Sequence, residues 1–333
     1  MMIKKLLLIL TAALAAATGL QAQTDPQFTQ YYQVPSYYNP AAIGNTDFIR
    51  IRGGARLQWV GIEHAPMTFA ATADMPLKVL GKRIGLGIAA SQDRAGLYRT
   101  LDVRAQAGYK LRKWGGEFTG AISVGLFSQG FKGSEVYLPD DDDYHESTDD
   151  GIPMQDVHGS TVDFGAGIWY EHPKFWAGVS GSHLTSPTVR MKVPGSEGGA
   201  AAGAETGEKY YEFNTKRTLY FMAGCNIPLS NTLFELAPSV LVRSDFTFTT
   251  GQVDIRAKYN KMFTFGVGYR YKDAITATLA AEIKQFFIGY SFDYSTTAIA
   301  KASSGSHEVF VGYSLKLDMG EKNTHRHKNI RLM

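Results

Sequence analysis

The densest group of potential metal ligands in this sequence is the run PDDDDYHESTDDG, which covers residues 139–151. Its six aspartates and one glutamate offer the hard oxygen ligands that calcium prefers. The spacing does not follow the D-x-[DN]-x-[DN]-G pattern of an EF-hand loop. We therefore interpret the acidic stretch 140–150 as a solvated loop, with calcium binding as the alternative.

The eight histidines show no HExxH motif and no other paired ligand spacing. Ser182-His183 and Ser306-His307 are adjacent pairs. A hydrolase dyad needs two side chains that face each other, whereas neighbours on a strand point to opposite faces. The single cysteine, Cys225, cannot form an internal disulfide. The sequence therefore predicts no catalytic, cofactor-binding or metal-binding residue.

A second set of charged residues lies in segments that alternate like β-strands. Charged groups along one face of a strand are costly in a dry core but suit a wet barrel lumen. We expect them to form an ion-pair network that fills the barrel, with a surface that grips an acidic ligand or segment as the alternative. These candidate lumen charges are Arg50, Arg52, Arg56, Asp102, Arg104, Asp254 and Arg256, together with Arg270 and Glu282.

The elements that must position these residues are strands, because period-two alternation recurs over about ten residues at a time. We predict an all-β fold, a transmembrane antiparallel β-barrel of about 14 strands. A soluble β-sandwich, whose strands also alternate, is the alternative. The predicted strands cover about 47–60, 66–74, 82–93, 98–112, 116–130, 160–171, 174–185, 217–228, 231–243, 246–259, 261–272, 274–284, 286–295 and 307–318.

The connections between these segments alternate between tight turns and longer loops. Every long connection, at 131–159, 186–216 and 296–306, has an odd number in chain order. Outer-membrane barrels have short periplasmic turns and longer external loops. The pattern therefore predicts that both termini face the periplasm.

Three tryptophans, Trp114, Trp169 and Trp176, fall near the predicted periplasmic ends of the strands, and Trp59 falls near an outer end. Aromatic girdles lie at the two membrane interfaces. We therefore expect these residues to belong to such a girdle.

The first 22 residues have the features of a secretory signal peptide. Lys4 and Lys5 precede an apolar run, and Leu20-Gln21-Ala22 forms an exit with a small residue. A retained transmembrane helix is the alternative, but the run is short for a bilayer span. We assign residues 1–22 to a signal peptide that is cleaved near Ala22.

The net charge of +3 does not indicate nucleic-acid binding, because the basic C-terminal residues account for it. We predict that residues 319–333 form a basic periplasmic tail, which could contact an acidic partner. The low-complexity stretch 195–207 is predicted to be a flexible linker.

Residues 23–46 form a separate N-terminal segment with many aromatic residues and almost no charge. The segment has neither a helical period nor clean alternation. Because so many aromatic side chains should not be left in water, we predict that it fills the barrel as a plug, with a docking surface on the periplasmic rim as the alternative. Residues 47–318 would then form the barrel. The candidate plug or partner contacts are Phe28, Tyr31, Tyr32, Tyr37 and Tyr38.

The stretch DPQFTQYYQVPSYYNPAAIG, residues 25–44, resembles the opening of the PorP/SprF family of outer-membrane proteins. Further matches are the R-x-Q-W-x-G block at 56–61 and Gly305-Ser306-His307-Glu308 before the last strand. This resemblance spans the mature chain to about 318. The resemblance implies that the chain belongs with the type IX secretion and gliding machinery of Bacteroidota.

The resemblance implies a non-enzymatic barrel in contact with outer-membrane lipids. Its partners would be ring or lipoprotein components of the type IX secretion system, and a secreted adhesin-like cargo. An outer-membrane transport channel for hydrophobic or nutrient solutes is the alternative. An enzyme such as a lipase or protease would need facing catalytic groups, which the strand parity does not supply.

Overall fold

The computed structural model describes residues 25–136, 152–193 and 210–317. Eighteen antiparallel strand segments form one sheet. The sheet closes on itself because β1 (Phe48–Leu57) pairs with both β2 (Met67–Val79) and β18 (Ser306–Lys316). Three of the wall strands are each interrupted along their length, so the 18 segments make up 14 strands of a closed barrel. The predicted fold is therefore confirmed.

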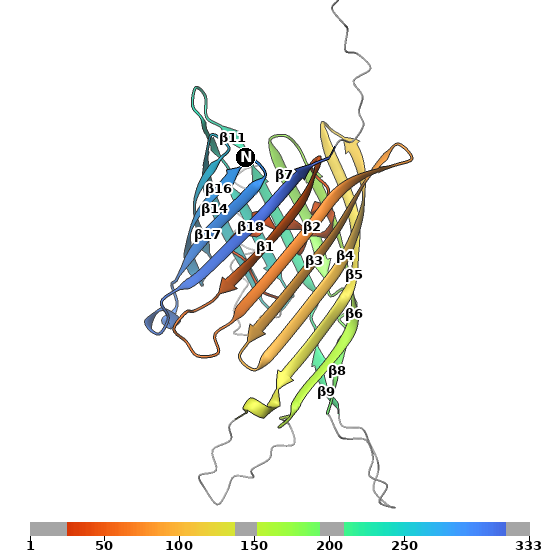
Figure 1. Ribbon diagram of the computed structural model, residues 1–333, viewed down its shortest axis with the longest axis vertical. Helices are drawn as coiled ribbons and strands as arrows, with labels where there is room; N and C mark the ends of the chain where they lie inside the picture. The colour runs from red at the N-terminus through yellow and green to blue at the C-terminus, as the bar shows by residue number, and fades with distance from the viewer. Residues whose placement is uncertain (1–24, 137–151, 194–209, 318–333) are drawn as a thin grey trace, which may run out of the picture.

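Ten of the eleven uninterrupted strands have ten or more residues, which is long enough to cross a bilayer when tilted. Figure 1 shows them tilted in the same sense around the barrel. Besides β1, β2 and β18, they are β3 (Lys82–Ala95), β4 (Tyr98–Lys113), β5 (Gly116–Lys132), β6 (Asp156–Glu171), β14 (Thr249–Tyr259), β15 (Phe263–Arg270), β16 (Ala274–Ile283) and β17 (Phe286–Ser295). The interrupted spans are β7 (Phe175–Ser182) with β8 (Thr188–Lys192), β9 (Tyr210–Asn214) with β10 (Thr218–Cys225) and β11 (Ile227–Pro228), and β12 (Phe234–Leu236) with β13 (Ser239–Ser244).

The alternation predicted from the sequence separates the two faces of the barrel wall. On β4, the side chains of Leu101 and Val103 are exposed on the outside, whereas Asp102 and Arg104 are buried inside. Other strands repeat this pattern, and Ile122 on the outer face of β5 is 67% exposed. An apolar outer face suits lipid, and a polar inner face needs water or another occupant. Within the described residues, no helix has the length and apolar character needed to cross a membrane.

The two ends of the barrel differ in how the strands are connected. At the end that we call the short-turn end, β2 joins β3 through Leu80 and Gly81, and β4 joins β5 through Trp114 and Gly115. All four turn residues have positive φ angles, which is the geometry of a tight type I′ hairpin. The opposite, long-loop end carries the short helices η3 (Gly133–Glu135) and η4 (Ala298–Lys301).

The predicted loop at 186–216 contains a strand pair that the sequence prediction missed. β8 pairs with β9 and prolongs the wall at the long-loop end, as Figure 1 shows at its lower edge. Val189 and Met191 of β8 are buried in a cluster with Phe127 and Val157. Each strand has only five residues, which is too short for the alternation to be distinctive. The stretches 140–150 and 195–207 lie outside the described residues, as do 1–22 and 319–333.

The predicted girdle position is wrong for two of the four tryptophans. Trp169 and Trp176 point into the barrel, where their rings stack with centroids 5.0 Å apart. Their outward neighbours Ile168 and Phe175 are exposed instead. A position near a strand end does not decide between the two faces, whereas strand parity does. Trp114, by contrast, is exposed in its short turn.

The N-terminal segment lies inside the barrel and contains three helices of a single turn. They are η1 (Tyr31–Gln33), α2 (Pro35–Tyr38) and η2 (Pro40–Ala42). A proline begins both α2 and η2, and the side chain of Asn39 caps η2 by accepting a hydrogen bond from the amide of Ala41 at 2.9 Å. Helices this short cannot be stable alone, so their conformation depends on the wall around them. We call residues 25–44 the plug.

Candidate functional site

The aromatic residues that were predicted either to form a plug or to contact a partner lie in the lumen. Phe28, Tyr31, Tyr37 and Tyr38 are buried, and Tyr32 is partly buried against them. Phe28 packs edge-on against Tyr37, with ring centroids 5.3 Å apart, and Tyr37 packs against Tyr38 at 5.0 Å. The plug therefore has a small apolar core of its own, which contacts the wall.

Buried phenols need hydrogen-bond partners, and the barrel wall and the plug itself supply them. The hydroxyl of Tyr31 donates to Ser239 Oγ at 2.7 Å, and that of Tyr37 donates to Ser91 Oγ at 3.3 Å. The hydroxyl of Tyr38 accepts the amide of Phe28 at 2.7 Å. Burial raises the pKa of Tyr32 to about 12, so this phenol is neutral at physiological pH.

Glu308 of β18 holds the start of the plug. Its two carboxylate oxygens accept the backbone amides of Thr29 and Gln30 at 2.8 and 2.7 Å. The guanidinium of Arg56 lies 3.2 Å from the same carboxylate, and both side chains are buried. Hydrogen bonds to a charged acceptor in a dry site are stronger than neutral ones. The last wall strand is thus tied to a segment that precedes the first wall strand.

Asp293 of β17 completes this anchor. The hydroxyl of Thr29 donates to Asp293 at 2.7 Å, and Arg56 and Arg270 lie 2.7 and 3.2 Å from the same carboxylate. In this anchor, the charges of the two buried guanidinium groups of Arg56 and Arg270 are therefore balanced by the two buried carboxylates of Asp293 and Glu308. Neither acid was among the predicted lumen charges. Strand parity was the available signal, because each residue alternates with outward apolar neighbours.

Asp25 anchors the first described residues of the plug to the opposite wall. Its carboxylate lies 3.0 Å from Nε2 of His183, whose Nδ1 lies 3.1 Å from Asp163. Burial acts to raise the pKa of Asp25, but His183, Tyr220 and Arg243 together outweigh it and hold the pKa well below its usual range. The hydroxyl of Tyr220 also donates to Asp25. His183 therefore lies between two carboxylates.

Arg104 and its neighbours satisfy the backbone of the plug. The guanidinium of Arg104 donates to the carbonyl of Tyr37 at 3.1 Å and lies 3.1 Å from Asp102. The side chain of Gln106 donates to the carbonyl of Ser36 at 2.7 Å. Buried backbone carbonyls without a partner would cost free energy, so these polar wall residues stabilise a folded segment inside the lumen.

The other predicted charges lie nearer the short-turn end. Arg50 makes two hydrogen bonds with Asp74, at 3.0 and 3.2 Å, and Asp74 accepts the amide of Gly44 at the end of the plug. Arg52 donates to Ser314 at 3.2 Å, and no carboxylate of the described chain lies within 4.0 Å of it. The predicted ion-pair network therefore covers only part of the set.

Arg256 and Asp254 flank the aromatic side of the plug. The guanidinium of Arg256 stacks on the ring of Tyr32, 3.5 Å from its centroid, and donates to Ser239 at 3.0 Å. The carboxylate of Asp254 accepts hydrogen bonds from Gln252 at 3.1 Å. Arg256 thus binds the plug through a cation–π contact and has no carboxylate within 4.0 Å among the described residues.

Glycines of the wall leave the space that the plug occupies. A Cβ atom at Gly85 would lie 2.8 Å from the side chain of Ile43 and 2.9 Å from its carbonyl oxygen. We expect Gly85→Val to displace the plug and to lower the free energy of unfolding by about 1–3 kcal/mol through overpacking. The temperature at which the folded band disappears in unheated gel electrophoresis measures this loss.

Gly120→Val is the matched control, because nothing lies within 4 Å of a Cβ atom at Gly120. Gly120 has the same residue type and lies in β5, but on the outward face. Equal loss of stability in both variants would contradict the role of Gly85 as space for the plug.

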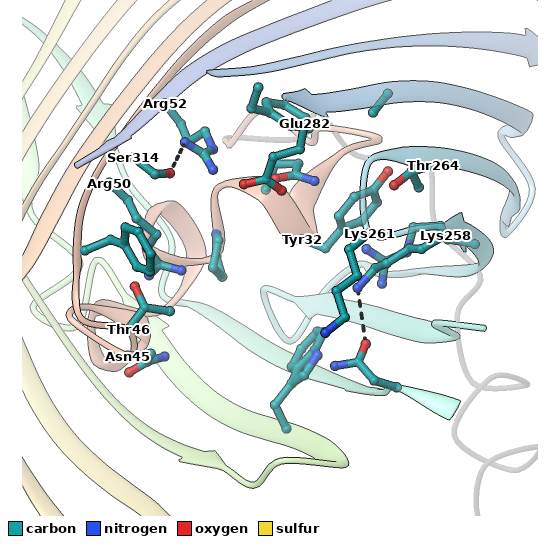
Figure 2. Close-up of a pocket in the computed structure, with 18 of the residues that line it drawn as sticks. Tyr32, Asn45, Thr46, Arg50, Arg52, Lys258, Lys261, Thr264, Glu282 and Ser314 are labelled. Carbon is teal, nitrogen blue, oxygen red and sulfur yellow. Dashed lines mark hydrogen bonds between the residues drawn. The ribbon is translucent and has the colours of Figure 1, made fainter. Parts of the chain in front are cut away.

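A cavity of about 580 Å³ remains between the plug and the short-turn end. Its walls are built from the strand ends and its floor from Tyr32, Gln33 and Pro35 of the plug (Figure 2). In the described ranges, no three His, Cys, Asp or Glu residues are grouped so that they could hold a metal ion.

Several solved outer-membrane proteins share distant structural likeness with this chain. The toluene transporter TbuX of Ralstonia pickettii has 11% identity and a TM-score of 0.47, over 84% of this chain and 92% of that one. A FadL homologue of Pseudomonas aeruginosa has 10% identity and a TM-score of 0.48, over 91% and 97%. The toluene transporter TodX of Pseudomonas putida has 9% identity and a TM-score of 0.47, over 88% and 95%. These likenesses are too remote to bear on function.

The sequence comparisons give a more specific result. No curated protein matches the chain. The family model for "Type IX secretion system membrane protein PorP/SprF" matches residues 20–313, a range that includes the whole plug and nearly the whole barrel. The chain therefore belongs to the PorP/SprF family of type IX secretion system membrane proteins.

Proposed function

We propose that this protein is a non-enzymatic outer-membrane component of the type IX secretion system and acts as a docking protein, not as a pore. It associates with ring or lipoprotein components of the apparatus, anchors a secreted adhesin-like cargo at the cell surface, or does both. Membership of the PorP/SprF family supports its place in this system. The docking role rests on one observation, which is that the lumen is filled.

The filled lumen argues against a transport channel. A channel needs a continuous path, but Phe28, Tyr31 and Tyr38 of the plug are fully buried among wall residues. Charged hydrogen bonds from β17 and β18 hold the plug on one side, and Asp25 holds it on the other. Opening such a path would require several buried polar groups to lose their partners together.

The non-enzymatic assignment is supported by the surroundings of the groups that could act as nucleophile or base. Ser182 accepts a hydrogen bond from Arg104 at 3.1 Å, and His183 lies between two carboxylates. Both side chains make contacts inside the lumen, and they do not face a common space that a substrate could enter. Cys225 lies in a wall strand, where no such dyad surrounds it.

We further propose that the short-turn end faces the periplasm, with the leader cleaved near Ala22 and both termini on that side. The different lengths of the connections support this orientation, since outer-membrane barrels have short periplasmic turns. β1 begins and β18 ends at the short-turn end (Figure 1). Components of the apparatus would then approach this end, and a surface cargo the other.

Affinity purification of the full-length tagged protein from native outer membranes tests this function. We expect components of the type IX system, a large surface protein, or both to co-elute in amounts comparable to the bait. The untagged strain is the control for non-specific recovery. Recovery of neither class, together with steady ion conduction by the purified protein, would contradict the docking role and favour a channel.

A further inference from the structure

The cavity below the plug has the dimensions of a binding site. Its volume of about 580 Å³ lies within the range of about 300–1,000 Å³ that is usual for ligand pockets. It opens at the short-turn end, because its walls come from the first residues of β1 and β7 and the last residues of β6, β14 and β16. We call it the vestibule.

The charge of the vestibule is strongly unbalanced. Six basic side chains line it, against three acidic ones. The basic residues are Arg50, Arg52, Arg256, Lys258, Lys261 and Lys284, and the acidic residues are Glu171, Glu235 and Glu282. Figure 2 shows Arg50, Arg52, Lys258 and Lys261 arranged around one open space. A concave surface with one dominant sign of charge concentrates the opposite charge within it.

Most of these cations are not neutralised by the chain itself. Lys258 pairs with Glu235 at 3.3 Å, and Arg50 pairs with Asp74. The remaining four, Arg52, Arg256, Lys261 and Lys284, have no carboxylate within 4.0 Å in the described ranges. Arg52 and Arg256 are buried and already donate hydrogen bonds to Ser314 and Ser239. Lys261 and Lys284 are exposed, so these two ammonium groups are the ones suited to reach the carboxylates of a ligand.

The other lining residues favour a peptide over a small anion. Phe48 and Trp176 are partly exposed and supply apolar surfaces between the charges, and the buried Trp169 stacks on Trp176. A small inorganic anion would leave these surfaces exposed to water. A peptide segment with acidic side chains can bury its apolar parts on them while its carboxylates reach the cations.

The chain around this mouth does not supply such an acidic segment. β18 ends at the short-turn end, and the sequence beyond it holds four basic residues and one glutamate between 321 and 333. The acidic stretch 140–150 joins β5 to β6, which are connected at the opposite end. Neither a neighbouring tail nor a second copy of that tail complements a cationic vestibule.

We propose that the vestibule is the binding site for an acidic peptide segment of another protein, which enters from the short-turn end and rests against the floor of the plug. This inference depends on the proposed function only for the identity of that protein as part of the secretion system. The binding itself is a property of the isolated barrel.

The test uses the purified full-length protein in detergent and fluorescence anisotropy of a labelled peptide, tetraglutamate followed by phenylalanine. Lys261→Glu with Lys284→Glu reverses two cations that make no hydrogen bond or ion pair to any described residue, so folding should be kept. We expect this double variant to bind at least about tenfold more weakly, and we expect added salt to weaken binding to the unaltered protein.

Lys272→Glu with Lys301→Glu is the matched control, because it reverses the same number of exposed lysines at the long-loop end. This control should bind the peptide like the unaltered protein. Equal binding by both double variants, or equal binding of a tetraglutamine peptide, would overturn the proposal. So would displacement of the peptide by inorganic phosphate at an equal concentration of charge, because the site would then take small anions.

The outcome separates this inference from the proposed function. Peptide binding to the vestibule without any type IX component in the affinity purification would leave the inference standing and remove the docking role in that system. If type IX components co-elute even with the Lys261→Glu, Lys284→Glu protein and the unaltered protein binds no peptide, the docking role would stand and the vestibule proposal would fail.

Discussion

Deletion of residues 25–40 is expected to convert a closed barrel into one that conducts ions. The wall ladder contains none of these residues, so the sheet should still close through β1 and β18. The emptied lumen would be lined by polar groups such as Arg104, Gln106 and Asp293, which water can solvate. Barrels of 16–18 strands enclose aqueous channels, whereas those of about eight are filled by side chains. A barrel of 14 strands therefore needs an occupant to be closed.

Planar-bilayer recordings of the purified variant measure this effect. The deletion should give resolved channel steps under conditions in which the full-length protein gives none. A protein lacking residues 195–207, a stretch of similar length outside the described residues, is the control and should remain closed. A deleted barrel that stays silent although it is folded and inserted would show that other parts of the chain close the lumen.

Glu308→Ala is expected to loosen the plug without removing it. The substitution leaves the amides of Thr29 and Gln30 without an acceptor and leaves Arg56 paired with Asp293 alone. Breaking a buried ion pair by removing one partner costs about 3–5 kcal/mol. If that cost falls on the attached state of the plug, the detached population rises by about 150- to 4,000-fold.

Chemical labelling of a single cysteine in the plug reports this change. Cys225 is the only cysteine of the chain, so Cys225→Ser with Ser36→Cys places one thiol at a fully buried plug position. Adding Glu308→Ala should accelerate modification by a water-soluble maleimide by the factor above. Glu212→Ala is the control, because Glu212 forms its ion pair with Arg190 in the exposed β8–β9 pair. Equal acceleration by both substitutions would refute the anchoring role of Glu308.

Strand parity was the signal that made the barrel predictable. It assigned the arginines of β1 to the lumen and the apolar residues between them to the outside, as the structure has them. Parity also places Trp169 and Trp176 inside, whereas a position near a strand end is compatible with either face. Five-residue strands such as β8 gave too short a pattern to detect.

The partners within the lumen could not be predicted in the same way. The anchor of the plug joins Thr29, Arg56, Asp293 and Glu308, which are brought together only when the last strand pairs with the first. Parity shows that a residue points inward, but the register around a closed barrel decides which inward residues meet. The three short helices of the plug likewise depend on tertiary contacts, because their local propensity is weak.

The vestibule illustrates the same limit. The sequence predicted Arg50, Arg52 and Arg256 as members of one lumen set with Arg56 and Arg104. The structure divides this set, because Arg50, Arg52 and Arg256 line the vestibule and Arg56 and Arg104 do not, although Arg50 and Arg256 also contact the plug. The position at which the plug ends therefore decides which of these charges also border the vestibule.

The central claim is that residues 25–44 fill the lumen of the native protein. Labelling of the Cys225→Ser, Ser36→Cys protein with a water-soluble maleimide in isolated outer membranes tests it most directly, with Glu308 intact. The buried position of Ser36 predicts no modification of the folded protein and complete modification after denaturation. Rapid labelling of the folded protein would contradict the account, because the segment would then lie outside the barrel.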